Sequence, residues 1–67
     1  MSDFKISLAA ARVNAGYSQQ ELADKMGVSR TTIINWESGK SKIGTAQLHY
    51  FCEVCKAPLY FISLPNL

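Results

Sequence analysis

The stretch of sequence that decides the fold is SQQELADKMGVSRTTIINWESGK, residues 18–40. It opens with Ser18 and Glu21 in S-x-x-E spacing, in which each side chain can satisfy a free backbone N–H at the start of a helix. Gly27 follows, and glycine is the residue that most often ends a helix in the left-handed conformation. The spacing therefore predicts a short helix over residues 18–26, with a tight turn after it.

A second helix is predicted over about residues 29–38, with Ser29 as its N-cap and Gly39 after its end. At 100° per residue, Ile33 and Trp36 fall on one side together with Glu37. The opposite side is polar apart from one isoleucine, and it carries Arg30, Thr31, Ile34, Asn35 and Ser38. We expect Ile33 to anchor this helix in a core and the polar side to face outward.

The rest of the chain also reads as helix. Residues 4–15 have regularly spaced apolar side chains and no breaker, and residues 45–55 and 59–62 form two further helical segments. In residues 45–55 the side chains expected to point inward are Leu48, Phe51, Cys52 and Cys55. The predicted fold class is all-α: a compact bundle of four to five short helices, in a single domain spanning residues 1–67.

The composition bounds the function. The 67 residues have 48% apolar content, which is ample for a packed core, and a net charge of only +2, which by itself does not suggest nucleic acid. No apolar run approaches the roughly 20 residues of a membrane span, and the N-terminus does not resemble a secretory signal. We expect a cytoplasmic protein without a membrane partner.

Cys52 and Cys55 have the CxxC spacing of redox pairs and zinc sites. Both fall within a helical pattern on one apolar face, and His49 is the only histidine, so one chain cannot complete a four-ligand zinc site. Buried structural thiols are the favoured interpretation, and redox or metal chemistry is the alternative. We expect no metal and no cofactor.

Reading duplex DNA requires a helix in the major groove with polar side chains near its N-terminus. The helix over residues 29–38 offers such side chains. Arg30 can bind guanine O6 and N7 as a fork, and Asn35 can bind adenine N6 and N7 in the same way. Gln19 lies at the start of the preceding helix, where the helix terminus itself attracts phosphate. These residues predict a sequence-specific DNA-binding surface.

The segment resembles the helix-turn-helix of the lambdoid-repressor family, which includes phage repressor and Cro proteins and related bacterial regulators. The family pattern G-x-S-Q-x-E-L-A, G-V-S and I-x-x-W-E-x-G-K is present at residues 16–23, 27–29 and 33–40. The resemblance extends over about residues 8–62. Each fragment is weak alone, but their joint spacing is specific, and it implies the lambda-repressor-like DNA-binding fold.

The resemblance also implies roles for individual residues. Base-reading positions fall on Arg30, Thr31, Asn35 and Gln19. Positions at or near DNA phosphates fall on Ser29, Thr32, Trp36, Ser38, Lys40 and Lys42. Arg12 and Glu37 match a pair that forms a largely buried salt bridge in the family, which would explain an acidic residue on a DNA-reading helix.

Two departures from the family pattern lie at Ile43, where proline is common, and at Lys56, where glycine is common. The apolar C-terminal stretch corresponds to a segment that forms the dimer contact in many relatives. The residues expected at such an interface are Leu59, Tyr60, Phe61 and Ile62. The alternative is that these side chains only cover the small core.

We therefore expect a Cro-like or repressor-type regulator that binds a palindromic double-stranded DNA operator as a homodimer. We expect no enzymatic activity, because no acid–base cluster, catalytic pairing or phosphate loop is present, and no small-molecule ligand. One alternative is an antitoxin that binds a toxin as well as its operator, although the chain has little room for the toxin-wrapping extension common in antitoxins. A restriction-modification controller is another alternative.

Overall fold

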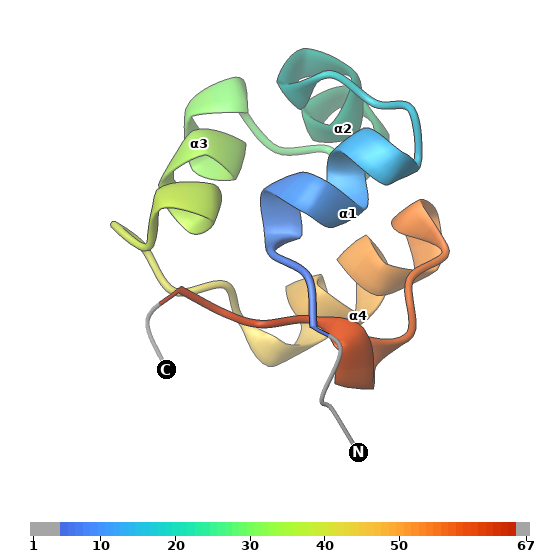
Figure 1. The fold of residues 1–67 in the computed structure, drawn as a ribbon. Coiled ribbons are helices and arrows are strands. Elements are labelled where there is room, and N and C mark those ends of the chain that lie inside the picture. Colours follow the sequence, from blue (N-terminus) through green and yellow to red (C-terminus); the bar gives the residue numbers. More distant parts are fainter. Residues whose placement is uncertain (1–4, 66–67) are drawn as a thin grey trace.

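The computed structural model describes residues 5–65, which fold into four α-helices and one short 3-10 helix (Figure 1). In chain order they are α1 (Leu8–Asn14), α2 (Gln19–Met26), α3 (Arg30–Ser38), α4 (Thr45–Cys55) and the 3-10 helix η1 (Leu59–Phe61). The predicted all-α class is confirmed. No helix in the described part of the chain combines the length and apolar character needed to cross a membrane.

The capping pattern around α2 and α3 forms as predicted. The Ser18 side chain accepts from the backbone N–H of Glu21 at 3.1 Å, and the Glu21 carboxylate accepts from the Ser18 N–H at 2.8 Å. At α3, the Ser29 hydroxyl accepts from the backbone N–H of Thr32 at 3.1 Å. Gly27 ends α2 with a φ of 71°, in the left-handed region that favours glycine. These bonds fix where both helices begin and how the turn leaves α2.

The first helix is shorter than the sequence predicts. It begins at Leu8, with Ser7 as its N-cap, and Phe4 lies outside the described residues. Ile6 is extended and forms a parallel bridge with Ile62, in which the Ile6 N–H donates to the Phe61 carbonyl at 2.7 Å. The backbone of Ile6 therefore pairs with the C-terminal segment. Ile6 and Ile62 are 56 positions apart, so the spacing of apolar residues near Ile6 could not predict this pairing.

The two departures from the family pattern have distinct structural outcomes. Ile43 is buried in the loop before α4, where its side chain joins the core. Lys56 ends α4 with a φ of 54°, so a lysine adopts the left-handed conformation that glycine usually takes. The predicted fifth α-helix after Pro58 is instead the single 3-10 turn η1.

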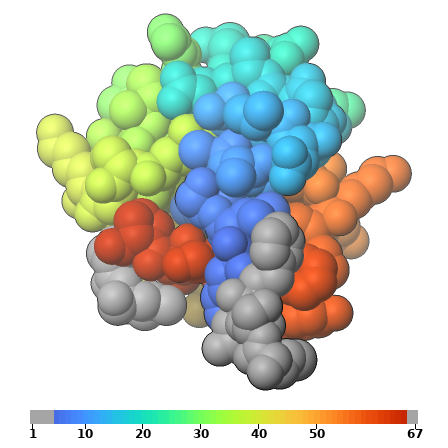
Figure 2. Space-filling model, viewed as in Figure 1, coloured from blue at the N-terminus to red at the C-terminus, as the bar shows by residue number. Residues whose placement is uncertain are grey.

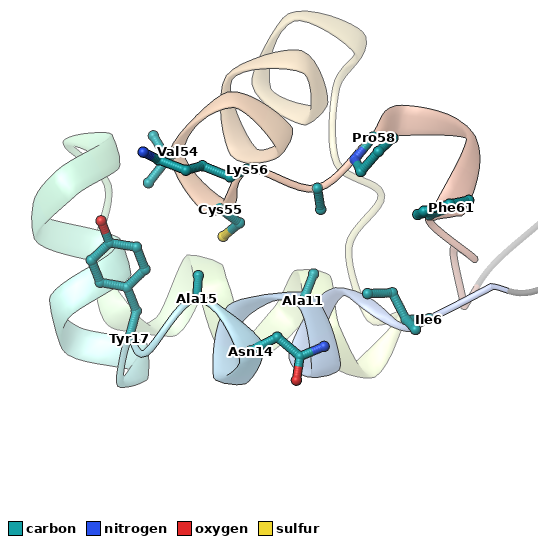
Figure 3. Close-up of a pocket in the computed structure, with 11 residues that line it drawn as sticks. Ile6, Ala11, Asn14, Ala15, Tyr17, Val54, Cys55, Lys56, Pro58 and Phe61 are labelled. Carbon is teal, nitrogen blue, oxygen red and sulfur yellow. The ribbon is translucent and has the colours of Figure 1, made fainter.

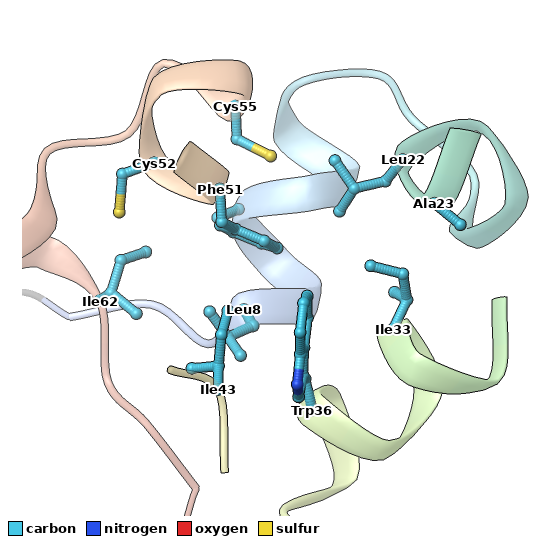
Figure 4. Close-up of a cluster of buried hydrophobic side chains, with 11 residues drawn as sticks. Leu8, Leu22, Ala23, Ile33, Trp36, Ile43, Phe51, Cys52, Cys55 and Ile62 are labelled. Carbon is cyan, nitrogen blue, oxygen red and sulfur yellow. The ribbon is translucent and has the colours of Figure 1, made fainter. Parts of the chain in front are cut away.

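The core lies between all four α-helices (Figure 4). Its fully buried large side chains are Phe51, Leu8, Leu22 and Ile33. α2 and α3 pack most extensively against one another, and α1 and α4 close the other sides. Because Ile33 is completely buried, the opposite side of α3 must face solvent.

Candidate DNA interface

The outward side of α3 carries the polar side chains that the sequence places there. Arg30, Thr31 and Ser38 are exposed, and Asn35 is half-buried. Ile34, on the same side of the helix, is 38% exposed. The polar surface follows directly from the burial of Ile33 on the other side of the helix. In Figure 2, α2 and α3 (cyan to yellow-green) form a continuous part of the surface.

The N-terminal end of α3 presents hydroxyl groups. The Ser29 Oγ lies 2.9 Å from the Thr32 Oγ1, and the same Ser29 oxygen caps the helix. Past the other end of the helix, Lys40 and Lys42 are both exposed in the loop that leads to α4. Donors and cations at both ends of a reading helix are the groups that fix a protein on the DNA backbone.

Trp36 combines core packing with a polar edge. The whole residue is 5% exposed, so most of the ring is buried. Within residues 5–65, every side-chain nitrogen or oxygen that is fully buried has a hydrogen-bond partner. The Trp36 indole nitrogen has no hydrogen-bond partner among these residues, so it cannot be one of these fully buried atoms. That nitrogen is therefore accessible at the surface, and Figure 4 shows it on the edge of the ring away from Phe51. The geometry is compatible with the predicted phosphate contact.

Glu37 is the most heavily bonded side chain on α3. The Arg12 Nε donates to its Oε2 at 2.7 Å, and a second Arg12 nitrogen lies 3.4 Å from its Oε1. The two side chains are only 13% and 9% exposed. The third Arg12 nitrogen donates to the backbone carbonyl of Tyr17 at 2.9 Å. Arg12 thus links α1, the loop before α2, and α3.

Glu37 has a further partner that sequence reasoning did not identify. The Gln19 Nε2 donates to the Glu37 Oε1 at 3.1 Å. Gln19 is the first residue of α2, so this bond joins the start of α2 to the C-terminal half of α3. No sequence spacing relates the two residues, since they lie on different helices. The structure connects Gln19 to α3 through Glu37.

Three exposed cations on α3 and in the loop after it are not paired with an acidic side chain within residues 5–65. The only ion pair among residues 5–65 joins Arg12 and Glu37, and it compensates the one acidic residue of α3. Arg30 on α3 and the two lysines after it are exposed. A surface with locally uncompensated cations suits a polyanion such as DNA.

The cysteine pair lies in the core. Cys52 and Cys55 are free and buried, and Figure 4 shows their sulfur atoms pointing in different directions. Burial raises the pKa of both thiols, that of Cys55 to about 11. Such thiols are protonated at neutral pH and therefore poor nucleophiles and metal ligands. Within the described residues no group of three or more potential metal ligands is present.

A cavity of about 510 Å³ lies between α1, the end of α4 and η1 (Figure 3). Its described lining is mainly apolar, and Figure 3 shows the Cys55 sulfur directed toward α1 across this space. None of the predicted DNA contacts is among the described lining residues. The cavity is therefore separate from the candidate interface.

The C-terminal apolar residues divide into two groups. Leu59 is 41% exposed and Tyr60 is 71% exposed, whereas Phe61 is half-buried. Ile62 is only 7% exposed and belongs to the protein's own core, so its side chain has almost no surface to offer a partner. The part of the predicted dimer contact that remains available is Leu59 and Tyr60, with the rim of Phe61.

The comparisons with known proteins agree with this geometry. The family model described as helix-turn-helix matches residues 8–59, which include all four α-helices. Comparisons with curated proteins and with solved structures gave no match. With a matching family model over most of its length and a capped, outward-facing α3, the chain belongs to the Cro/C1-type helix-turn-helix family and is a DNA-binding transcription regulator of that kind.

Proposed function

We propose that this regulator acts as a homodimer, binds a palindromic DNA operator and represses transcription by occupying it. Two copies of α3 would enter successive major grooves, about 34 Å apart on one side of the duplex. The observation that carries the proposal is the exposed polar side of α3, which buried Ile33 and Trp36 hold outward.

Within each half-site, base reading falls to Arg30, Thr31 and Asn35, which lie at the exposed side of α3. Arginine and asparagine provide the two forked contacts best suited to guanine and adenine. Ile34 lies beside them and is exposed, so it offers an apolar contact for a thymine methyl group. Gln19 is the fourth proposed base-reading residue, at the start of α2.

The residues proposed to contact DNA phosphates, and so to fix the position of the protein along the DNA backbone, are Ser29, Thr32, Trp36, Ser38, Lys40 and Lys42. The hydroxyls at the start of α3 lie where the helix dipole also favours a phosphate. Lys40 and Lys42 are exposed cations beyond its other end. Since few phosphates are contacted by one subunit, a single copy should bind weakly, and affinity should fall steeply with salt.

Dimerisation is proposed through η1. Tyr60 is the most exposed of the large apolar side chains described, and its ring meets the Phe61 ring edge-on at a centroid distance of 4.7 Å. Exposed aromatic side chains of this kind are typical anchors of protein–protein contacts. A second copy would cover this surface and double the number of phosphate contacts.

Two substitutions separate base reading from backbone binding. We expect Arg30→Ala to relax preference at one base position per half-site and to cost about 1–3 kcal/mol of binding free energy on the preferred site. Lys40→Ala should weaken binding to all sequences alike and should reduce the salt dependence by about one phosphate per subunit. Fluorescence anisotropy on a selected duplex and its single-base variants measures both effects.

The contrast between the two variants is the test. An Arg30→Ala protein that retains every base preference would remove Arg30 from the reading surface. A Lys40→Ala protein whose loss is confined to one base position would contradict the phosphate assignment. Lys25→Ala is the matched control, because Lys25 is an exposed lysine near the end of α2 and has no proposed DNA contact.

A further inference from the structure

We propose that Glu37 is a positioning residue for Gln19, and that it orients the Gln19 amide to select adenine in the operator. The inference rests on the proposed function, since it concerns how one base of the operator is chosen. It assigns Glu37 a role in specificity beyond its salt bridge with Arg12.

The contact itself is well placed for this role. The Gln19 Nε2 donates to the Glu37 Oε1 at 3.1 Å, and the Glu37 side chain is only 9% exposed. Gln19 is half-buried at the first position of α2. The Gln19 amide nitrogen is therefore held at the Glu37 carboxylate, and the amide oxygen has no hydrogen-bond partner within residues 5–65.

The chemistry of Glu37 fixes the orientation of that amide. An ionised carboxylate only accepts hydrogen bonds, so the Gln19 nitrogen faces it and the Gln19 oxygen does not. Arg12 holds the carboxylate with two nitrogens, one 2.7 Å from Oε2 and the other 3.4 Å from Oε1. Glu37 is thus immobilised by Arg12 and in turn prevents the Gln19 side chain from exchanging its oxygen and nitrogen.

For this role, Glu37 must take the N–H trans to the Gln19 carbonyl oxygen, which leaves the cis N–H and that oxygen side by side as one donor and one acceptor. Adenine offers an acceptor at N7 and a donor at N6 in the major groove, which is the complement of that pair. Guanine offers two acceptors there, N7 and O6, and would need both N–H groups of Gln19. Because Glu37 already takes one N–H, the arrangement favours adenine over guanine at the base that Gln19 meets.

The test begins by locating that base. Operator sequences are selected from random duplex DNA with the wild-type protein and with Gln19→Ala, and the position whose preference is lost in the variant is assigned to Gln19. We expect adenine at that position in the wild type, with discrimination against guanine of about 5- to 150-fold, as for a good bidentate contact. A uniform loss at all positions would make Gln19 a phosphate contact and would overturn the inference.

The second step removes the carboxylate without leaving a buried charge. The double variant Arg12→Met/Glu37→Met replaces the ion pair by apolar side chains, an exchange that is often well tolerated, whereas removing one partner alone is strongly destabilising. We expect its adenine-to-guanine discrimination at the Gln19 position to fall at least several-fold, with preferences at the α3-read positions retained. Unchanged discrimination, or equal relaxation at every position, would overturn the inference.

Arg12→Lys is the matched control, since it keeps a cation beside Glu37 and leaves the Glu37–Gln19 contact available; it should retain the adenine preference. If the wild type itself enriches no motif, the proposed function fails. If the wild type enriches a motif but the double variant keeps its adenine-to-guanine discrimination, or relaxes equally at every position, only the inference about Glu37 fails.

A measurement on the wild-type protein alone covers the case in which the double variant does not fold. In the NMR spectrum, one side-chain amide proton of Gln19 should be shifted downfield and exchange slowly with solvent, because it is bonded to Glu37. Gln47 is the internal control: its oxygen accepts from the Gly44 N–H, and its nitrogen has no partner in the described chain. Equal shifts and exchange rates for the two glutamines would contradict the fixed amide.

Discussion

Glu37 is an acidic residue on the helix proposed to face DNA, and its contacts explain why it is tolerated there. Arg12 compensates its charge at 2.7 Å from Oε2, and Gln19 donates to Oε1, which a second Arg12 nitrogen also approaches at 3.4 Å. Largely buried pairs of this kind contribute little net stability, but losing one partner typically costs about 3–5 kcal/mol. The pair is therefore better understood as fixing the direction of α3 than as strengthening the fold.

Lys56 is the clearest case of a residue in an unfavourable backbone conformation. It lies at the end of α4 with a φ of 54°, a region that costs a residue with a Cβ about 1–2 kcal/mol. We predict that Lys56→Gly raises the free energy of unfolding, because glycine adopts this conformation without strain. The relief of strain is about 1 kcal/mol, and the greater backbone entropy that glycine loses on folding offsets part of it. Urea denaturation followed by circular dichroism measures the change.

Lys56→Ala is the control for Lys56→Gly, because it removes the same charge and side-chain length but keeps the Cβ. It should not stabilise the protein. A gain equal to that of the glycine variant would locate the effect in the lysine side chain, and a loss in the glycine variant would contradict the conformational argument.

At the level of the helices, local signals were sufficient where the deciding interactions were local. The caps at Ser18 and Ser29 and the break at Gly27 are contacts within a few residues, and they predicted α2 and α3 correctly. The start of α1 was predicted wrongly because Ile6 pairs with Ile62, which depends on the folded C-terminus. The last helix became a 3-10 turn because Ile62 continues into that pairing.

Ser29 caps α3 and is also proposed to lie near a DNA phosphate, and substitutions at this position separate the two roles. Ser29→Ala removes the cap and should destabilise the protein by about 1 kcal/mol. Ser29→Asp preserves a good N-cap and should leave stability near that of the wild type, but it places a negative charge where a phosphate is proposed to bind. We predict that DNA affinity falls in the aspartate variant, as measured by anisotropy alongside urea denaturation.

The two Ser29 variants test separate roles of this side chain, one in stability and one in DNA binding. If Ser29→Ala is as stable as the wild type, the Ser29 cap does not contribute to the stability of α3. Wild-type affinity in Ser29→Asp would show that no phosphate approaches this end of the helix. Ser18→Asp is a useful comparison, because it makes the same exchange at the N-cap of α2.

For the whole molecule, the candidate site was predictable as a list of residues but not as a connected structure. Helical periodicity placed Arg30, Thr31 and Asn35 on one side of α3, and the structure has them on its solvent-facing side. Periodicity cannot report contacts between helices, so the Gln19–Glu37 bond was not foreseen. Ile62 could not be separated from its exposed neighbours for the same reason, since its burial depends on the packing of the complete chain.

Assembly is tested at Tyr60, which is 71% exposed and so tolerates substitution without loss of the fold. We predict that Tyr60→Glu raises the dimer dissociation constant about tenfold or more, because a charge replaces a central aromatic anchor. Sedimentation velocity over a concentration series measures it. Tyr50→Glu is the matched control: Tyr50 is also exposed, but it lies on α4, where its hydroxyl donates to the Lys25 carbonyl at 3.2 Å. Equal effects of both substitutions would contradict an η1 interface.

Two copies of the exposed α3 surface are proposed to read a symmetric operator. The most direct measurement is selection of bound sequences from random duplex DNA, carried out at two salt concentrations. We expect an enriched motif with dyad symmetry, half-sites about one helical turn apart, and weaker binding to the same motif at higher salt. Absence of any enriched motif would contradict sequence-specific reading, and an enriched motif without symmetry would contradict the dimer.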